Sequence, residues 1–282
     1  MIYGTGSYRF RVIEGWGCGP GAPTFGMTPS LAVDSRDQVV AFRRTPDPCV
    51  LVFDRAGQFL KSWGAGVFAE PHAIWVSASD RVYCTDREDH TVREFSSDGQ
   101  LLRTFGQPHH IGAPGEPFNK PAKAIVLPDG NMWVADGYGQ QRVHHFAPDG
   151  RPLRSWGEKG TGPGQLIFPH GVAIDHRGRV LIADREPNHR VSIFDQEGRP
   201  LDSWDGLLQP MDIALDGAGN IFVGEAHQRI SIFSPDGTLL ARFGEKGEAA
   251  GQFMSFIHGI WVDTHGDLYV ADERRVQKFE RI

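Results

Sequence analysis

The sequence predicts an all-β fold, a six-bladed β-propeller in which residues 1–282 form a single domain. Three observations lead to this prediction. A unit of four short apolar strands recurs along the chain, turn residues separate its strands, and the last unit lacks a strand that the N-terminus can supply. Four-stranded units that recur about every 40–50 residues are typical of propeller blades.

Each unit repeats the same order of elements. A first apolar strand, a turn with Asp or Gly, and a second strand ending in Ala-Asp or a variant of it lead to a polar loop. A third strand ends in Phe, and a turn that is often Asp-Gly precedes a fourth strand ending in an aromatic residue, mostly Trp-Gly or Phe-Gly. Asp-Gly suits a tight hairpin because such turns need positive φ. The five complete units are residues 29–64, 72–106, 122–157, 170–204 and 211–244.

The sixth unit, residues 258–282, stops after its third strand. Residues 8–17, YRFRVIEGWG, show the apolar alternation and the terminal Trp-Gly of the other fourth strands. We therefore expect this N-terminal strand to complete the last blade. Closure of the ring in this way leaves no open sheet edge between the first and last blades.

The composition argues against several kinds of partner. The net charge of -6, with mixed signs, provides no basic surface for nucleic acid. No apolar run approaches the roughly 18 residues of a membrane span, and the N-terminus shows no secretory signal.

Cys18, Cys49 and Cys84 lack metal-site spacing and suit reduced, mainly buried thiols in a cytoplasmic protein. The sequence indicates no oligomeric state.

Histidine occupies one repeated position in alternate units. This position, here called the slot, is the start of the first strand beside the expected central channel, and in units 1 to 6 it holds Pro29, His72, Ala122, His170, Met211 and His258. The three histidines are therefore evenly spaced around the ring and should converge on its axis. Duplication of a unit would not by itself restrict histidine to alternate blades.

Three neutral imidazoles at the mouth of a channel predict a metal site. Zn²⁺ binds histidine nitrogen and, in catalytic sites, keeps a fourth position open for water or substrate. No fourth protein ligand shares this layer, which favours a catalytic over a structural site. Iron(II) or another divalent ion also accepts imidazole. The alternative is that His72, His170 and His258 are hydrogen-bonded structural residues.

The loop after the second strand of each unit should surround the same mouth. The recurrent aspartates of these loops are expected to cap backbone N–H groups. The residues that follow them vary, and Arg44, Tyr138 and Arg185 are the candidates there for function. Arginine binds a carboxylate through two parallel hydrogen bonds, and a tyrosine hydroxyl beside a cation can move a proton. Ordinary surface roles are the alternative for each of them, and Arg87 fits a structural role better.

These motifs resemble those of a known family. The repeats resemble NHL repeats, and residues 20–282 resemble the catalytic domain of peptidyl-α-hydroxyglycine α-amidating lyase. The matching motifs are PHAIWV, KPAKAIV, VADGYGQQRVHHF, FPHGVAID, IADRE and IHGIWVDTHGDLYVAD. The resemblance implies that His72, His170 and His258 hold a catalytic zinc, that Tyr138 is the catalytic tyrosine, and that Arg44 and Arg185 are the active-site arginines.

The reaction implied by this resemblance splits a carbinolamide, N–CH(OH)–COO⁻, into an amide and glyoxylate. The partner is then a small-molecule or peptide-like substrate with a carboxylate. The family also has a structural calcium, held partly by an aspartate directly after the third histidine. Gly259 stands at that position here, which argues against a calcium site.

Two other functions fit a propeller. One is a metal-dependent hydrolase or lactonase. Known six-bladed lactonases rely mainly on carboxylate and amide ligands around calcium, so the three histidines argue against this alternative. The other is a non-catalytic NHL scaffold that binds a protein partner, which leaves the alternating histidines without a role.

Overall fold

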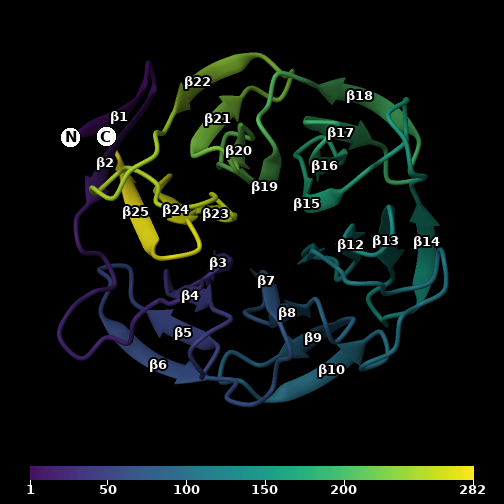
Figure 1. Cartoon of the computed structure of the whole chain (residues 1–282), viewed down its shortest axis with the longest axis horizontal. Helices are drawn as coiled ribbons and strands as arrows, with labels where there is room; N and C mark the ends of the chain where they lie inside the picture. Colours follow the sequence, from purple (N-terminus) through teal and green to yellow (C-terminus); the bar gives the residue numbers. More distant parts are fainter.

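Six antiparallel sheets form a closed ring around a central channel (Figure 1). The computed structural model describes residues 1–282, and its regular elements are all strands. The predicted six-bladed propeller is confirmed. Because the chain contains no helix, it has none that could cross a bilayer.

The first three blades each contain four strands in sequence order. Their strands are β3 (Ser30–Val33), β4 (Val39–Phe42), β5 (Val50–Phe53), β6 (Phe59–Trp63), β7 (Pro71–Val76), β8 (Val82–Asp86), β9 (Thr91–Phe95), β10 (Leu101–Phe105), β11 (Lys123–Val126), β12 (Met132–Asp136), β13 (Arg142–Phe146) and β14 (Pro152–Trp156).

Blades 4 and 5 repeat this order, and blade 6 combines the two ends of the chain. Their strands are β15 (Pro169–Ile174), β16 (Val180–Asp184), β17 (Arg190–Phe194), β18 (Pro200–Trp204), β19 (Pro210–Leu215), β20 (Ile221–Glu225), β21 (Arg229–Phe233), β22 (Leu239–Phe243), β23 (Gly259–Val262), β24 (Leu268–Ala271), β25 (Val276–Arg281), β1 (Ile2–Thr5) and β2 (Tyr8–Ile13).

The apolar core is divided into six clusters, one between each pair of neighbouring blades. The second and third strands of the blades are almost wholly buried, whereas the fourth strands alternate or are exposed at the outer rim. Each sheet therefore packs both faces against its neighbours, and the innermost strands line the channel (Figure 1). This arrangement fixes the height of every slot residue relative to the others.

The N-terminal strand closes the ring as expected. β2 pairs with β25 in antiparallel register, from Phe10 opposite Arg281 to Ile13 opposite Lys278. The strand ends at Ile13, earlier than the sequence predicts, because the chain turns through Gly15 and Gly17 at positive φ. A feature that the sequence does not predict is β1, which pairs with β2 as a fifth strand at the outer edge of blade 6.

The aromatic residue that ends a fourth strand packs beneath the hairpin turn of the next blade. A Cβ atom added to Gly99 would lie 2.7 Å from the Trp63 ring, and one added to Gly237 would lie 2.4 Å from Trp204. Both glycines also have positive φ. The terminal tryptophan of one blade and the Asp-Gly turn of the next thus form one packing contact between blades, which explains why they recur together.

A buried ion pair crosses the channel one residue beyond the slot. The Lys123 ammonium of blade 3 donates to Asp212 Oδ1 of blade 5 at 2.5 Å, and the two side chains are 6% and 5% exposed. Asp212 also accepts hydrogen bonds from the backbone N–H groups of Ile213 and Ile260. The pair therefore ties blades 3, 5 and 6 together inside the channel.

We expect Lys123→Met to destabilise the fold by about 3–5 kcal/mol, because it leaves the Asp212 carboxylate buried without a cation. Urea unfolding followed by tryptophan fluorescence measures the loss. The double variant Lys123→Met/Asp212→Asn removes both charges and keeps an acceptor for the backbone N–H groups, so it should recover much of the stability. An unchanged midpoint for Lys123→Met would contradict a stabilising role for the ion pair.

Candidate metal centre and active site

The structure brings His72, His170 and His258 together at one end of the channel. Each offers a ring nitrogen, and these three nitrogens lie within 4.8 Å of one another. The side chains come from blades 2, 4 and 6, and all three residues are buried. The group formed by these three imidazoles is called the tripod below.

Backbone carbonyls of the alternate blades hold the three rings. His72 Nδ1 donates to Ala122 O at 2.6 Å, His170 Nδ1 to Met211 O at 2.7 Å, and His258 Nδ1 to Pro29 O at 3.0 Å. Each acceptor is the slot residue of the next blade. Because Nδ1 carries the proton in these bonds, Nε2 of each ring keeps its lone pair free for a metal or a hydrogen-bond donor.

Glycine follows His170 and His258, and the same carbonyls approach it closely. A Cβ atom on Gly259 would lie 2.6 Å from Pro29 O, and one on Gly171 would lie 2.8 Å from Met211 O. An aspartate at position 259 would therefore need the neighbouring strand to move. The His-Gly pairs of the sequence are explained by this close packing.

Burial keeps the tripod neutral. It lowers the pKa of His72 and of His170 well below the usual range, and it lowers the pKa of His258 to about 3. The charges of nearby groups add to this effect: Arg44 lowers the pKa of His72 and His258, and Arg185 lowers that of His170 and His258. The imidazoles are thus in the protonation state that metal coordination requires.

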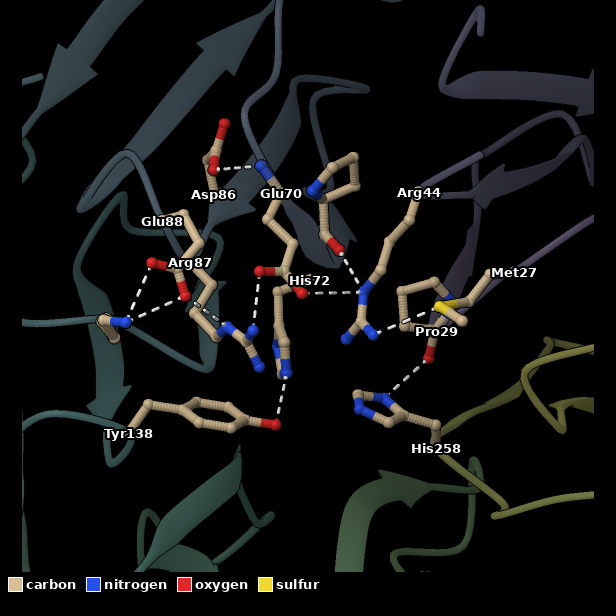
Figure 2. A network of polar contacts seen from close by, with 12 residues as sticks. Met27, Pro29, Arg44, Glu70, His72, Asp86, Arg87, Glu88, Tyr138 and His258 are labelled. Atoms are coloured by element: carbon tan, nitrogen blue, oxygen red, sulfur yellow. Dashed lines mark hydrogen bonds and ion pairs between the residues drawn. The ribbon is translucent and has the colours of Figure 1, made fainter. Parts of the chain in front are cut away.

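Tyr138 reaches the tripod from the loop after β12. Its hydroxyl lies 2.9 Å from His72 Nε2 (Figure 2). It also lies 3.3 Å from His170 Nε2. Glycines flank it for steric reasons, since a Cβ on Gly137 would lie 2.0 Å from Pro169 O and one on Gly139 would meet the Asn119 side chain. The Asp-Gly-Tyr-Gly motif therefore presses this loop against its neighbours and directs the phenol at the histidines.

The two predicted arginines lie at the rim of the same mouth. Arg44 Nε donates to Pro71 O at 3.1 Å, and its side chain is 17% exposed. The Arg185 guanidinium stacks on the Phe168 ring at 4.3 Å and is 12% exposed. Phe168 in turn packs edge to face on Tyr138, with ring centroids 4.7 Å apart. All six residues singled out from the sequence are therefore gathered at one end of the channel.

Two further residues lie at the mouth: Arg87, which the sequence places there in a structural role, and Glu70, which the sequence does not single out. Glu70 pairs with Arg87 Nη2 at 2.6 Å and lies 3.5 Å from Arg44 Nε, so it joins the two guanidinium groups. Arg87 lies over the Tyr138 ring, 4.6 Å from its centroid. Arg87 follows Asp86 as Arg185 follows Asp184, so the repeat itself places Arg87 at the mouth, whereas Glu70 stands where blade 4 has Phe168 and is marked by no repeated residue type.

The recurrent acidic residues fix the loops that carry these groups. Asp184 Oδ1 accepts the N–H groups of Ile167 and Phe168, and Asp86 accepts those of Ala69 and Glu70. The segment before each of these two slots is thereby held to the end of the second strand. The expectation that the aspartates cap backbone N–H groups is met at both positions.

Comparison with known proteins agrees with the repeat analysis. The NHL repeat model matches residues 166–194. The chain is 34% identical over 186 residues to human NHL repeat-containing protein 3, covering 61% of this chain and 52% of that protein. It is 32% identical over 131 residues to Drosophila melanogaster peptidyl-α-hydroxyglycine α-amidating lyase 1, covering 44% of this chain and 24% of that protein. The matched part thus spans about half, or less, of these relatives.

Among solved structures, a gluconolactonase from Xanthomonas campestris superimposes with a TM-score of 0.70 at 16% identity, covering 96% of this chain and 94% of that one. At this identity the likeness shows the fold alone. The chain is therefore a six-bladed propeller with an NHL repeat, and over part of its length it resembles the peptidyl-α-hydroxyglycine α-amidating lyases.

Proposed function

We propose that this protein is a metal-dependent lyase that cleaves the C–N bond at a hydroxylated carbon. The substrate is a carbinolamide, N–CH(OH)–COO⁻, in a small-molecule or peptide-like compound, and the products are an amide and an aldehyde acid such as glyoxylate. The observation that carries the proposal is the tripod of neutral imidazoles with a tyrosine hydroxyl against it and guanidinium groups around it.

The donor set fits a divalent metal ion, for which we propose zinc. All three Nδ1 atoms are engaged by carbonyls, so the Nε2 atoms carry the lone pairs that can bind one ion. The Tyr138 hydroxyl contacts Nε2 of His72 and His170, and an ion would replace it as their partner. The group contains no fourth histidine, cysteine or carboxylate, which leaves a coordination position for substrate. Iron(II) or another divalent ion would use the same ligands. When bound, such an ion supplies a Lewis acid for the substrate hydroxyl.

Tyr138 is the proton carrier of the proposed reaction. The cleavage moves the hydroxyl proton of the carbinolamide to the departing amide nitrogen, while the C–N bond breaks and a C=O bond forms. The Tyr138 hydroxyl lies at the tripod and is the nearest proton-transferring group to it, so it can take the first proton and deliver one to nitrogen. Arg87 over the ring and Phe168 at its edge restrict its movement.

The arginines bind the substrate carboxylate. Arg44 and Arg185 stand on different sides of the tripod, on blades 1 and 4, and each presents a partly exposed guanidinium group. Arg44 Nε lies 3.5 Å from Glu70, which Arg87 binds more closely. Arg185 donates two hydrogen bonds of 3.3 Å to Glu186, whose side chain is 45% exposed, and a substrate carboxylate can take the place of this carboxylate. A bound carboxylate places the adjoining hydroxylated carbon near Tyr138.

Protein purified without a metal-affinity tag should contain about one zinc ion per chain, because three imidazoles share one site. Elemental analysis of His170→Ala should show most of this metal lost. His227→Ala, which removes an exposed histidine, is the matched control and should keep it. Equal metal content in the two variants would contradict the tripod as the binding site.

The wild-type protein should release glyoxylate from α-hydroxyhippurate. We expect Tyr138→Phe to lower kcat by about 10²–10⁴-fold, the usual contribution of a positioned proton-transfer group. Its zinc content should stay at the wild-type level, which separates loss of the proton carrier from loss of the metal. Normal turnover by Tyr138→Phe would reject the assigned role of Tyr138 and leave the metal proposal standing.

Arg185→Ala should raise KM for the same substrate by roughly ten- to a hundredfold, since it removes a charged hydrogen-bond donor to the carboxylate. The control is Arg177→Ala, which removes a half-exposed arginine paired with Asp236 and should leave KM unchanged. Arg190 is less suitable, because its side chain holds a loop through several backbone carbonyls. An unaltered KM in Arg185→Ala would mean that another group binds the carboxylate.

A further inference from the structure

A buried hydrogen-bond network lies at the base of the loop that carries Tyr138. The Asp136 side chain, at the end of β12, is fully buried, and its Oδ2 atom accepts three hydrogen bonds. The donors are the Asn119 backbone N–H at 2.8 Å, Gln140 Nε2 at 2.7 Å and His144 Nε2 at 3.2 Å. Gln140 and His144 are themselves buried. One carboxylate oxygen thus joins the loop after β12, the segment before β11 and strand β13.

In the other blades an arginine binds the equivalent carboxylate. Blades 2 to 6 each have an aspartate or glutamate at the end of the second strand or directly after it. Four of these acidic residues form ion pairs of 2.5–3.9 Å with an arginine at or beside the third strand: Asp86 with Arg93, Asp184 with Arg190, Glu225 with Arg229, and Asp272 with Arg275. In blade 3 the partner is His144. The blade that carries Tyr138 is therefore the one in which an imidazole replaces the guanidinium group.

The network ties together the two ends of the loop that carries Tyr138. Asp136 begins this loop and Gln140 ends it, and their side chains contact each other. Gln140 Nε2 also donates to Glu116 O at 2.8 Å, and its Oε1 accepts from the Gly115 N–H at 3.0 Å. The loop is thereby fixed to the segment that precedes β11.

The same segment holds the middle of the loop. Asn119, whose N–H belongs to the network, accepts the Gly139 N–H at 3.0 Å, and its Nδ2 donates to Gly139 O at 3.1 Å. The His144 ring packs edge to face on Phe118 of this segment, with ring centroids 5.6 Å apart. The phenol, which lies 2.9 Å from His72 Nε2 (Figure 2), therefore depends on the network for its direction.

We propose that His144 and Gln140 are positioning residues for Tyr138 and act through the Asp136 carboxylate. This inference rests on the proposed lyase function, in which Tyr138 carries the proton. A carboxylate only accepts hydrogen bonds, so the two side chains donate to it. Asp136 Oδ1 has no hydrogen-bond partner, and Oδ2 therefore bears the whole network. Without one of the donors, the carboxylate turns and the ends of the loop move apart, which displaces the phenol from the tripod.

Turnover of α-hydroxyhippurate by two variants of similar shape tests the inference. We expect His144→Met, which has no donor, to lower kcat by about ten- to a hundredfold, the scale on which a small displacement of a reacting group acts. KM and zinc content should stay at the wild-type values. His144→Gln should remain within about twofold of the wild-type kcat, because its amide still donates to the carboxylate. The control is His145→Phe, which keeps an aromatic ring against Trp133 and should change no value.

Wild-type kcat in His144→Met, or an equal loss of kcat in His144→Gln, would overturn the inference. A raised KM or lost zinc in His144→Met would show general damage to the site and would overturn it as well. If His144→Met does not fold, Gln140→Met takes its place, since it removes the other side-chain donor and keeps the contact of His144 with Asp136. The same loss of kcat is expected, and an unchanged kcat rejects the assignment.

If the wild-type protein does not turn over the substrate, the lyase proposal fails, and NMR of metal-free protein with ring-labelled tyrosine decides the positioning role. The chain has five tyrosines, and the Tyr138 signal is the one that Tyr138→Phe lacks. His144→Met should shift this signal and leave those of the other tyrosines in place, whereas His144→Gln should shift none. A Tyr138 signal that does not move in His144→Met rejects the inference.

Discussion

The site depends on one interaction repeated three times, the hydrogen bond from a histidine Nδ1 to the slot carbonyl of the following blade. This bond fixes the tautomer and the direction of each ring. It fits the alternation, since the even blades supply imidazoles and the odd blades supply acceptors, and it leaves no room for a side chain directly after His170 or His258. A ring of six similar blades thereby becomes a site with threefold symmetry.

The electrostatic environment differs above and below the tripod. At the mouth, the guanidinium groups of Arg44, Arg87 and Arg185 pair with Glu70, Glu88 and Glu186, and these arginines are among the charges that lower the pKa of the tripod histidines. One residue deeper, the charges of Lys123 and Asp212 cancel each other. The neutral imidazoles lie between these two regions. An anionic ligand at the tripod would be attracted by the arginines of the mouth and would meet no unpaired charge on the side of Lys123 and Asp212.

Much of this arrangement could be predicted from the sequence because it repeats. The strand order, the ring closure and the alternating histidines all follow from comparing equivalent positions in six units. Features that belong to one blade could not be found in this way. β1 lies outside any unit, the early end of β2 depends on two glycines in a local turn, and Lys123 and Asp212 are 89 residues apart on blades that are not adjacent. The link from Glu70 to two arginines depends on loop conformation, which residue spacing does not specify.

The Lys123–Asp212 pair also affects which end of the channel a ligand can use to reach the tripod. It bars the axis just behind the tripod, and toward the opposite face Trp75 and Trp261 stand with ring centroids 4.9 Å apart. Both contacts narrow the channel behind the histidines, so the mouth that carries Arg44, Tyr138 and Arg185 is the approach for a ligand of the tripod. In the proposed reaction the products would leave through the mouth by which the substrate enters, so a product retained at the mouth would be a competitive inhibitor of the next substrate molecule.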